Sequence, residues 1–234
     1  MAKASDNEFP KIVLAEQGST PSTPAAGTQK LFIDDADHKL KMVNESDVVT
    51  EVGDSGGGGG SLVFLESHIA STSATLDFTL LDDAYNDYLL KITGLVPSSS
   101  ANNLIVRFAT DATPTWDAGN NYRWFRWYWS MAAASGVTAD GGATSNIQIA
   151  ASVATTSGHS VNADIHLSNL RTAALYKSIN SRLEQLISSD GNLYGINTIG
   201  MWVDNTHKAY GIRLLMSSGN IASGAAYLYG IKDS

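Results

Sequence analysis

Residues 121–129 carry the sequence Asn121-Tyr122-Arg123-Trp124-Phe125-Arg126-Trp127-Tyr128-Trp129, in which six side chains are aromatic. Side chains of a β-strand point alternately to the two faces of its sheet, so this segment would have two aromatic faces. One face would carry Tyr122, Trp124, Arg126 and Tyr128, and the other Arg123, Phe125, Trp127 and Trp129. One of the two faces is expected to enter a protein core.

The second face of this strand needs a cover, because a row of exposed aromatic side chains is unusual in a soluble protein. It would be buried by another subunit, stack with its own arginine, or remain open as a platform for sugars. We favour burial in the core and between subunits, because large aromatic side chains mostly pack. The residues concerned in either role are Tyr122, Trp124, Arg126, Trp127, Tyr128 and Trp129.

Strand-like segments separated by turn-forming dipeptides continue on both sides of this stretch. The ten strands expected after residue 61 span residues 62–66, 74–79, 85–92, 103–109, 122–131, 146–151, 161–168, 195–204, 210–217 and 225–231. This succession predicts an all-β fold, an antiparallel β-sandwich of jelly-roll type over residues 62–234. Residues 175–187 stay open between helix and strand, although their apolar spacing fits a helix better.

The first 61 residues differ in character from the rest. Residues 1–28 are interrupted by Pro10, Pro21 and Pro24 and predict an extended arm, and strands at 30–33, 40–43 and 48–52 predict a small β-meander. We interpret residues 1–55 as an anchor and the glycine-rich residues 56–61 as a hinge. The apolar residues expected to make anchoring or intersubunit contacts are Phe9, Ile12, Val13, Leu14, Leu31, Phe32 and Ile33.

Composition excludes several classes of function. The net charge of -8 repels nucleic acid and anionic membranes, so neither is expected as a partner. The chain has no cysteine and therefore no disulfide or thiolate metal site. Its start lacks a secretory signal and its apolar runs fall far short of the ~18 residues of a membrane span, so synthesis in a cytoplasm without membrane insertion is expected.

No motif of the sequence predicts catalysis. Residues Gly53-Asp54-Ser55-Gly56-Gly57 match the segment around a serine-protease nucleophile, but His38 is the only histidine before Ser55 and the required order of residues is absent. The glycine run lacks the lysine of a phosphate-binding loop. We therefore expect no enzymatic activity and no cofactor.

Acidic residues also predict no metal site. Asp34, Asp35 and Asp37 lie in one turn, but Ala36 and His38 occupy positions where a calcium loop needs oxygen ligands, so a solvated turn is the better interpretation. The four other histidines are scattered without ligand spacing. Asp77, Asp82, Asp83 and Asp87 show no spacing that would single out a glycosidase pair.

Two stretches resemble structural proteins of tailed-bacteriophage virions. The first is Thr20-Pro21-Ser22-Thr23-Pro24-Ala25-Ala26-Gly27-Thr28-Gln29-Lys30-Leu31-Phe32-Ile33-Asp34. The second is Ile69-Ala70-Ser71-Thr72-Ser73-Ala74-Thr75-Leu76-Asp77-Phe78, together with residues 85–92 and the ending Ser218-Gly219-Asn220-Ile221-Ala222-Ser223-Gly224-Ala225-Ala226-Tyr227-Leu228-Tyr229-Gly230-Ile231-Lys232. The pattern is similar to a β-sandwich module of phage tail fibres, head fibres and decoration proteins.

The resemblance implies a role and a set of partners. It implies a homotrimer located in the virion, made in the host cytoplasm, held to other virion proteins by residues 1–55 and able to contact a host surface glycan. The alternatives are a decoration or cement protein that stabilises the head lattice and a free carbohydrate-binding module. A depolymerase is disfavoured because no catalytic constellation is present.

Overall fold

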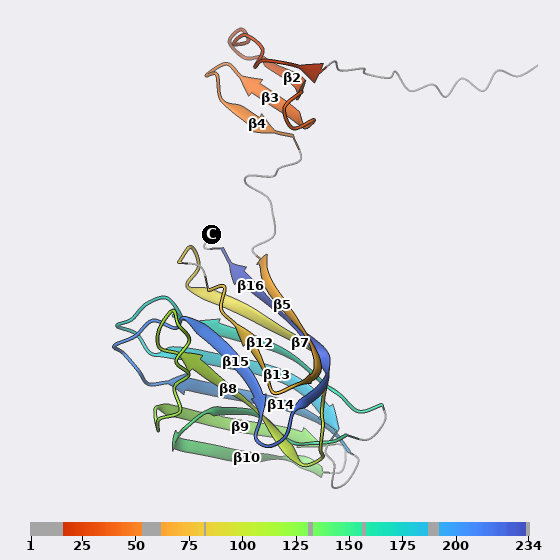
Figure 1. Ribbon diagram of the computed structural model, residues 1–234, viewed down its shortest axis with the longest axis vertical. Coiled ribbons are helices and arrows are strands. Elements are labelled where there is room, and N and C mark those ends of the chain that lie inside the picture. The colour runs from red at the N-terminus through yellow and green to blue at the C-terminus, as the bar shows by residue number, and fades with distance from the viewer. Residues whose placement is uncertain are drawn as a thin grey trace, which may run out of the picture. The chain divides into compact units, whose positions relative to one another are not determined.

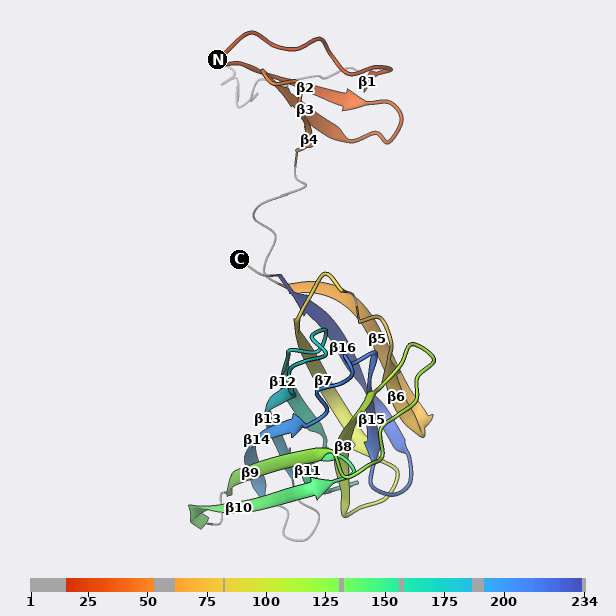
Figure 2. The ribbon, with the colours of Figure 1, turned by 90° about the vertical axis from the view of Figure 1, so that its left-hand side faces the viewer.

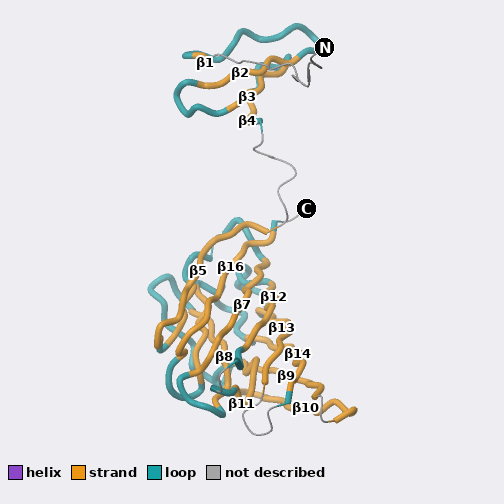
Figure 3. Tube along the Cα trace, turned by 90° about the vertical axis from the view of Figure 1, so that its right-hand side faces the viewer, coloured by secondary structure: helices purple, strands orange, loops and turns teal. Residues whose placement is uncertain are grey.

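The computed structural model describes residues 16–52, 62–81, 83–130, 133–155, 158–186 and 192–232, with the backbone alone for 133–137. The chain divides into two compact units, Met1–Gly60 and Ser61–Ser234 (Figure 1). Every regular element of the described residues is a strand, as the colouring of Figure 3 shows. The expected all-β, antiparallel sandwich fold is confirmed, and no helix in the described ranges could span a membrane.

The N-terminal unit is one small sheet in the order β1-β2-β3-β4. Its strands are β1 (Glu16–Gln17), β2 (Gln29–Asp34), β3 (Leu40–Asn44) and β4 (Val49–Glu51). The last three form the expected antiparallel meander, whereas β1 pairs in parallel with β2. Residues 16 and 17 of the expected arm thus add a short strand to this sheet. Phe32 and Val43 are the buried hydrophobic residues described in the unit, and Pro24 is its other buried residue.

The larger unit is a sandwich of two antiparallel sheets of unequal size, seen from two sides in Figures 1 and 2. The eight-stranded sheet runs β10 (Ala133–Thr144), β9 (Tyr122–Ser130), β14 (Leu193–Trp202), β13 (Lys177–Leu186), β12 (Val161–Ser168), β7 (Asp87–Pro97), β16 (Ile221–Ile231) and β5 (Leu62–Ser73). The four-stranded sheet runs β11 (Ile147–Val153), β8 (Asn102–Ala109), β15 (Gly211–Met216) and β6 (Thr75–Phe78).

The core lies between these two sheets, and a strict alternation of side chains creates it. In β12, Val161, Ala163, Ile165 and Leu167 are buried, and the residues between them face outward. Ile165 lies opposite Leu90 of β7 in the antiparallel register, so apolar side chains form rows across the sheet. Burial of these rows is the main stabilising contribution to the sandwich.

Two strands differ from the sequence-based expectation. Residues 177–186 form β13, so the helical alternative for residues 175–187 is wrong. Three of the inward-facing residues of β13 are polar, namely Lys177, Ser181 and Gln185, and this hides the period of two. Strand β10 was not expected, because its Ala-, Gly-, Ser- and Thr-rich sequence carries little strand signal. β5 also runs to Ser73, beyond its expected end.

The two edges of the eight-stranded sheet are unlike each other. β10 has two register shifts against β9, one before Val137 and one after Gly141, and a positive φ at Ala143. β5 is a strand of 12 residues that pairs with β16 over nearly its whole length and has no other strand neighbour in the described sheet. It exposes 56% of Phe64 and 80% of Ile69.

Candidate functional site

Strand β9 is held between β10 and β14, next to one edge of the larger sheet (Figure 2). Its start is fixed by stacked rings, with Phe108 and Trp202 5.4 Å apart and Tyr122 6.4 Å from each. The Tyr122 hydroxyl accepts a hydrogen bond from the Phe108 amide and donates one to the Asp117 carbonyl. Burial raises the pKa of this hydroxyl, which therefore stays protonated. The strand enters the sheet in a single, well-fixed register.

The inward face of β9 carries Tyr122, Trp124, Arg126 and Tyr128. Tyr122 is fully buried, and Trp124 and Tyr128 pack against the core. Arg126 is only 5% exposed, and its guanidinium lies 5.2 Å from the Trp124 ring centroid and 6.0 Å from that of Tyr128. These four residues are packing residues of the sandwich, so a saccharide platform cannot be built on them.

The Arg126 guanidinium is poorly satisfied. Its Nε and Nη1 atoms are buried and have no hydrogen-bond partner in the part of the chain that the structure describes. Burial disfavours the charged form and lowers the pKa of Arg126. Within the described residues, the Trp124 and Tyr128 rings are the favourable contacts of this charge, so burying the residue is an energetic cost to the fold.

The outward face of β9 carries the aromatic row, which we define as Phe125, Trp127 and Trp129. The Phe125 and Trp127 rings are 5.4 Å apart and inclined at 40°, and Trp127 and Trp129 are 6.3 Å apart and nearly perpendicular at 84°. Phe125 is 43% exposed and Trp129 48%. The row is therefore a solvent-facing aromatic surface along the outer face of β9.

Strand β14 extends this surface sideways. Ile199 lies opposite Phe125 in the register, Met201 lies opposite Arg123, and both apolar residues are exposed. Together with Asp140 of β10, these residues line a shallow depression of about 430 Å³. Most of its lining is apolar, and Arg123 and Asp140 are its charged residues.

Glycine leaves one end of the row uncovered. Gly195 of β14 lies directly opposite Trp129 in the antiparallel register. A Cβ atom at Gly195 would meet no atom within 4 Å, so the space beside Trp129 on this strand is open. Because Gly195 has no side chain, β14 does not cover the Trp129 ring at this position.

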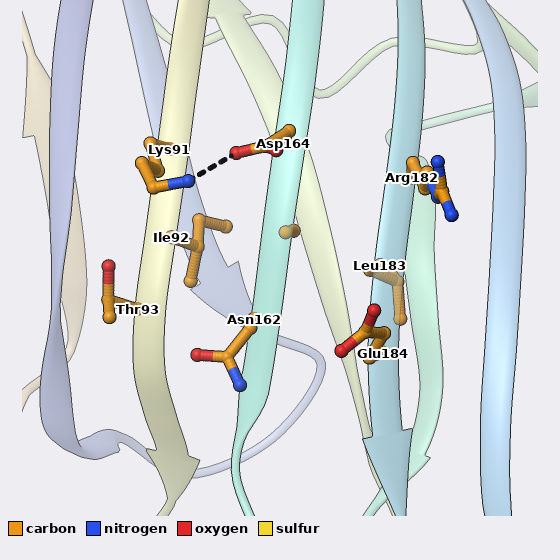
Figure 4. Close-up of a pocket in the computed structure, with 9 residues that line it drawn as sticks. Lys91, Ile92, Thr93, Asn162, Asp164, Arg182, Leu183 and Glu184 are labelled. Carbon is orange, nitrogen blue, oxygen red and sulfur yellow. Dashed lines mark hydrogen bonds and ion pairs between the residues drawn. The ribbon is translucent and has the colours of Figure 1, made fainter.

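The outward face becomes polar on the next strands. Figure 4 shows Lys91 of β7 pointing toward Asp164 of β12, with a distance of 2.9 Å between the ammonium and carboxylate. Asn162, Arg182 and Glu184 surround this pair and line a second depression of about 330 Å³. The sheet therefore presents an aromatic strip beside a strip of hydrogen-bonding groups.

The residues expected to anchor the chain are only partly described. Phe9, Ile12, Val13 and Leu14 lie outside the described residues, as do residues 53–61 with the glycine run and Ser55. In β2, Leu31 is 50% exposed, Phe32 is buried and Ile33 is half-buried. Leu31 is thus an accessible apolar contact on the small sheet, whereas Phe32 packs within it.

The acidic turn of the N-terminal unit is a set of ion pairs. The Lys41 ammonium lies 2.6 Å from Asp34 and 2.8 Å from Asp37. The hydrogen bond to Asp34, aided by the one to Asp37, raises the pKa of Lys41 to about 12. Within the described ranges, no group of three His, Asp or Glu side chains is placed to hold a metal ion.

Of the four carboxylates considered for hydrolysis, Asp82 lies outside the described residues and the other three serve in structural contacts. Asp77 receives two hydrogen bonds from Arg213, at 2.7 and 2.6 Å. Asp83 is paired with Arg171 and Lys208. Asp87 accepts a hydrogen bond from the Asn169 amide. These hydrogen bonds and ion pairs hold strand edges and loops together.

The structure thus divides the six aromatic-strand residues that the sequence singled out. Trp127 and Trp129 are outward, and the other four are inward. Phe125 belongs to the row as well, and strand alternation alone could have found it. Ile199, Met201 and Gly195 join the surface through the register between β9 and β14, which has no local signal in the sequence.

Comparison with known proteins finds no family model, no curated protein and no solved structure that matches this chain.

Proposed function

We propose that this chain is an oligomeric structural protein of a tailed-phage virion, a tail-fibre or surface-fibre component. Its N-terminal unit attaches it to the particle, and its sandwich is exposed and can contact the host. The observation that carries the proposal is the contrast between the cores of the two units. The resemblance of residues 20–34 and 69–78 to virion proteins supports the same proposal.

The small sheet has too little core to be a stable domain by itself. Phe32 and Val43 are its buried hydrophobic residues in the described range, and β1 and β4 have only two and three residues. A sheet of this size buries too little apolar surface to offset the entropy of ordering its chain. Docking on another protein, with Leu31 available as a contact, would supply the missing burial.

The sandwich differs in each of these respects. Its core joins residues from both sheets, from Leu76 and Phe78 of β6 to Ala226 and Leu228 of β16. The stacked cluster around Trp202 adds to it. A unit of this kind folds independently of a partner. An N-terminal unit that needs a partner and a sandwich that folds by itself suit a protein that is attached through the first and displays the second.

A truncation tests the attachment. Particles assembled with a chain that lacks residues 1–55 should contain none of this protein, while the truncated sandwich remains soluble and folded by circular dichroism. Phe32→Ala in the full chain is the matched point variant, because it removes the larger of the two core residues of the small sheet and should also reduce incorporation. Incorporation of the truncated chain at the native level would refute the anchoring role.

Oligomeric state is tested separately by light scattering. A trimer should scatter with three times the 24.8 kDa mass of the chain. A monomeric mass at all concentrations would contradict the oligomeric part of the proposal.

A further inference from the structure

We infer that the aromatic row binds a neutral oligosaccharide of β-linked hexoses, with the polar strip of β14 and β13 holding its hydroxyl groups. The inference deepens the proposed function, since it names the ligand class of the displayed sandwich, and it rests on that function only for its biological purpose. The binding itself is a property of the larger unit.

The accessible faces of the rings are the first argument. Trp129 is nearly half exposed, and Gly195 leaves the neighbouring strand bare beside it. A β-linked glucose ring has its hydroxyls in the ring plane and only C–H groups on its two faces, which fit an aromatic face. Trp127 and Trp129 are nearly perpendicular and cannot both lie flat on one extended sugar chain, so we assign the stacking contact to Trp129 and side contacts with the chain to Trp127 and Phe125.

The neighbours of the row are the second argument. Asn197 lies opposite Trp127 on β14, and Arg182 lies opposite Asn197 on β13. Asn180 lies opposite Ile199 in the same way. Amide and guanidinium groups placed beside an aromatic surface match a ligand that has C–H faces and hydroxyl edges. Glu184 and Asp140 also line the depressions of this surface, and carboxylates are depleted at the centre of a subunit interface.

The charges of this surface are the third argument. The outward charged residues of β10, β9, β14 and β13 in the described ranges are Arg123, Arg182, Asp140 and Glu184. Two are positive and two are negative, so the surface has no net charge to select an ionic ligand. The chain as a whole has a charge of -8, which repels acidic polysaccharides. A neutral sugar is the ligand that this balance favours.

The test is a titration of the full-length protein with cellohexaose, followed by tryptophan fluorescence. The native protein should bind with a saturable signal at millimolar or lower concentrations. Trp129→Ala should weaken binding about threefold to tenfold, the range expected for the loss of one stacked ring, and Trp127→Ala should weaken it less. Tyr176→Ala, which removes an exposed aromatic ring outside the row, is the matched control and should bind like the native protein.

A second variant separates ligand contact from damage to the strand. Gly195→Leu keeps all three rings but places a side chain beside Trp129, so it should weaken cellohexaose binding without lowering the thermal midpoint. Absence of saturable binding by the native protein, or unchanged binding in Trp129→Ala and Gly195→Leu, would overturn the inference. A fall in light-scattering mass for Trp127→Ala would assign the row to a second copy of the chain and would also overturn it.

The outcomes for the two proposals are distinguishable. The proposed attachment to the virion would be refuted by normal incorporation of the truncated chain, and this result does not involve the aromatic row. The proposed sugar site would be refuted by the absence of saturable binding in the fluorescence titration, which does not involve the N-terminal unit.

Discussion

Replacing Arg126 by methionine should stabilise the protein, although it removes a charged residue from the centre of a strand. The side chain is 5% exposed, and its buried Nε and Nη1 atoms lack hydrogen-bond partners among the described residues. Methionine has a similar length and fills the same space without a charge. The change therefore removes an unfavourable burial and keeps the packing.

The magnitude follows from opposing contributions. Two buried, unpaired donors destabilise the folded state by about 1–3 kcal/mol each, and burial of the charge destabilises it as well. Cation–π contacts with Trp124 at 5.2 Å and Tyr128 at 6.0 Å offset about 2 kcal/mol of it. The net expectation for Arg126→Met is a gain of about 1–3 kcal/mol in the free energy of unfolding. Such a gain corresponds to a rise of roughly 2–4 °C in the thermal midpoint per kcal/mol for a unit of this size.

The assay is urea unfolding at neutral pH, followed by circular dichroism and compared with Arg123→Met. Arg123 is on the same strand but faces outward and is exposed, so its replacement should stay within about 0.5 kcal/mol of the native value. If Arg126→Met were less stable than the native protein by 1 kcal/mol or more, the guanidinium would have to be well paired. The description of Arg126 as an unsatisfied charge would then be wrong.

Two further perturbations test the backbone and the loops. Gly224 has a φ of +116°, and a Cβ there would lie 2.5 Å from a backbone atom of β7. Gly224→Ala should therefore lower the free energy of unfolding by about 2–5 kcal/mol. The control Gly195→Ala, where a Cβ meets no atom within 4 Å, should change it by less than about 1 kcal/mol. Equal effects in urea titrations would show that the close approach is not a constraint. Burial alone would raise the pKa of Asp204, but hydrogen bonds from Thr206 and His207 outweigh it and hold the pKa at about 2. Because this folded-state pKa is below the ordinary value of 3.8, the contribution is present above pH 4 and is lost as the pH falls toward 2. Asp204→Asn should therefore cost about 1–2 kcal/mol at pH 7, after allowance for solvent screening, and almost nothing at pH 2; a constant difference in acid unfolding curves would contradict this.

Much of the sandwich could be predicted because its strands obey a simple alternation. Residues 161–168 were expected as a strand with the bounds that β12 has, since every second residue is apolar. The same rule divides β9 into its two faces. Where the alternation is broken by buried polar residues, prediction fails, as in β13. There Lys177 is fully buried and donates hydrogen bonds to the carbonyls of Ala173, Asp204 and His207.

The candidate site was predictable only in part. Alternation defines the two faces of β9, but each face has three aromatic residues and one arginine, so composition cannot say which enters the core. The four-stranded sheet decides it, because β11 contacts the inward face of β9, β14 and β13. The apolar extension through Ile199 and Met201 depends on long-range register, which a single sequence does not encode locally.

The unlike edges of the eight-stranded sheet set a limit on how the sandwich can multiply. β10 is broken by two register shifts against β9 and would make a poor template for an incoming strand, whereas β5 has 12 residues and a single register shift against β16, between Phe64 and Glu66. If two copies joined through β5, both β5 edges would be paired, and β10 would be the free edge of each eight-stranded sheet. The larger sheet could then double, but the irregular β10 edges left at both ends would oppose its further growth into a filament.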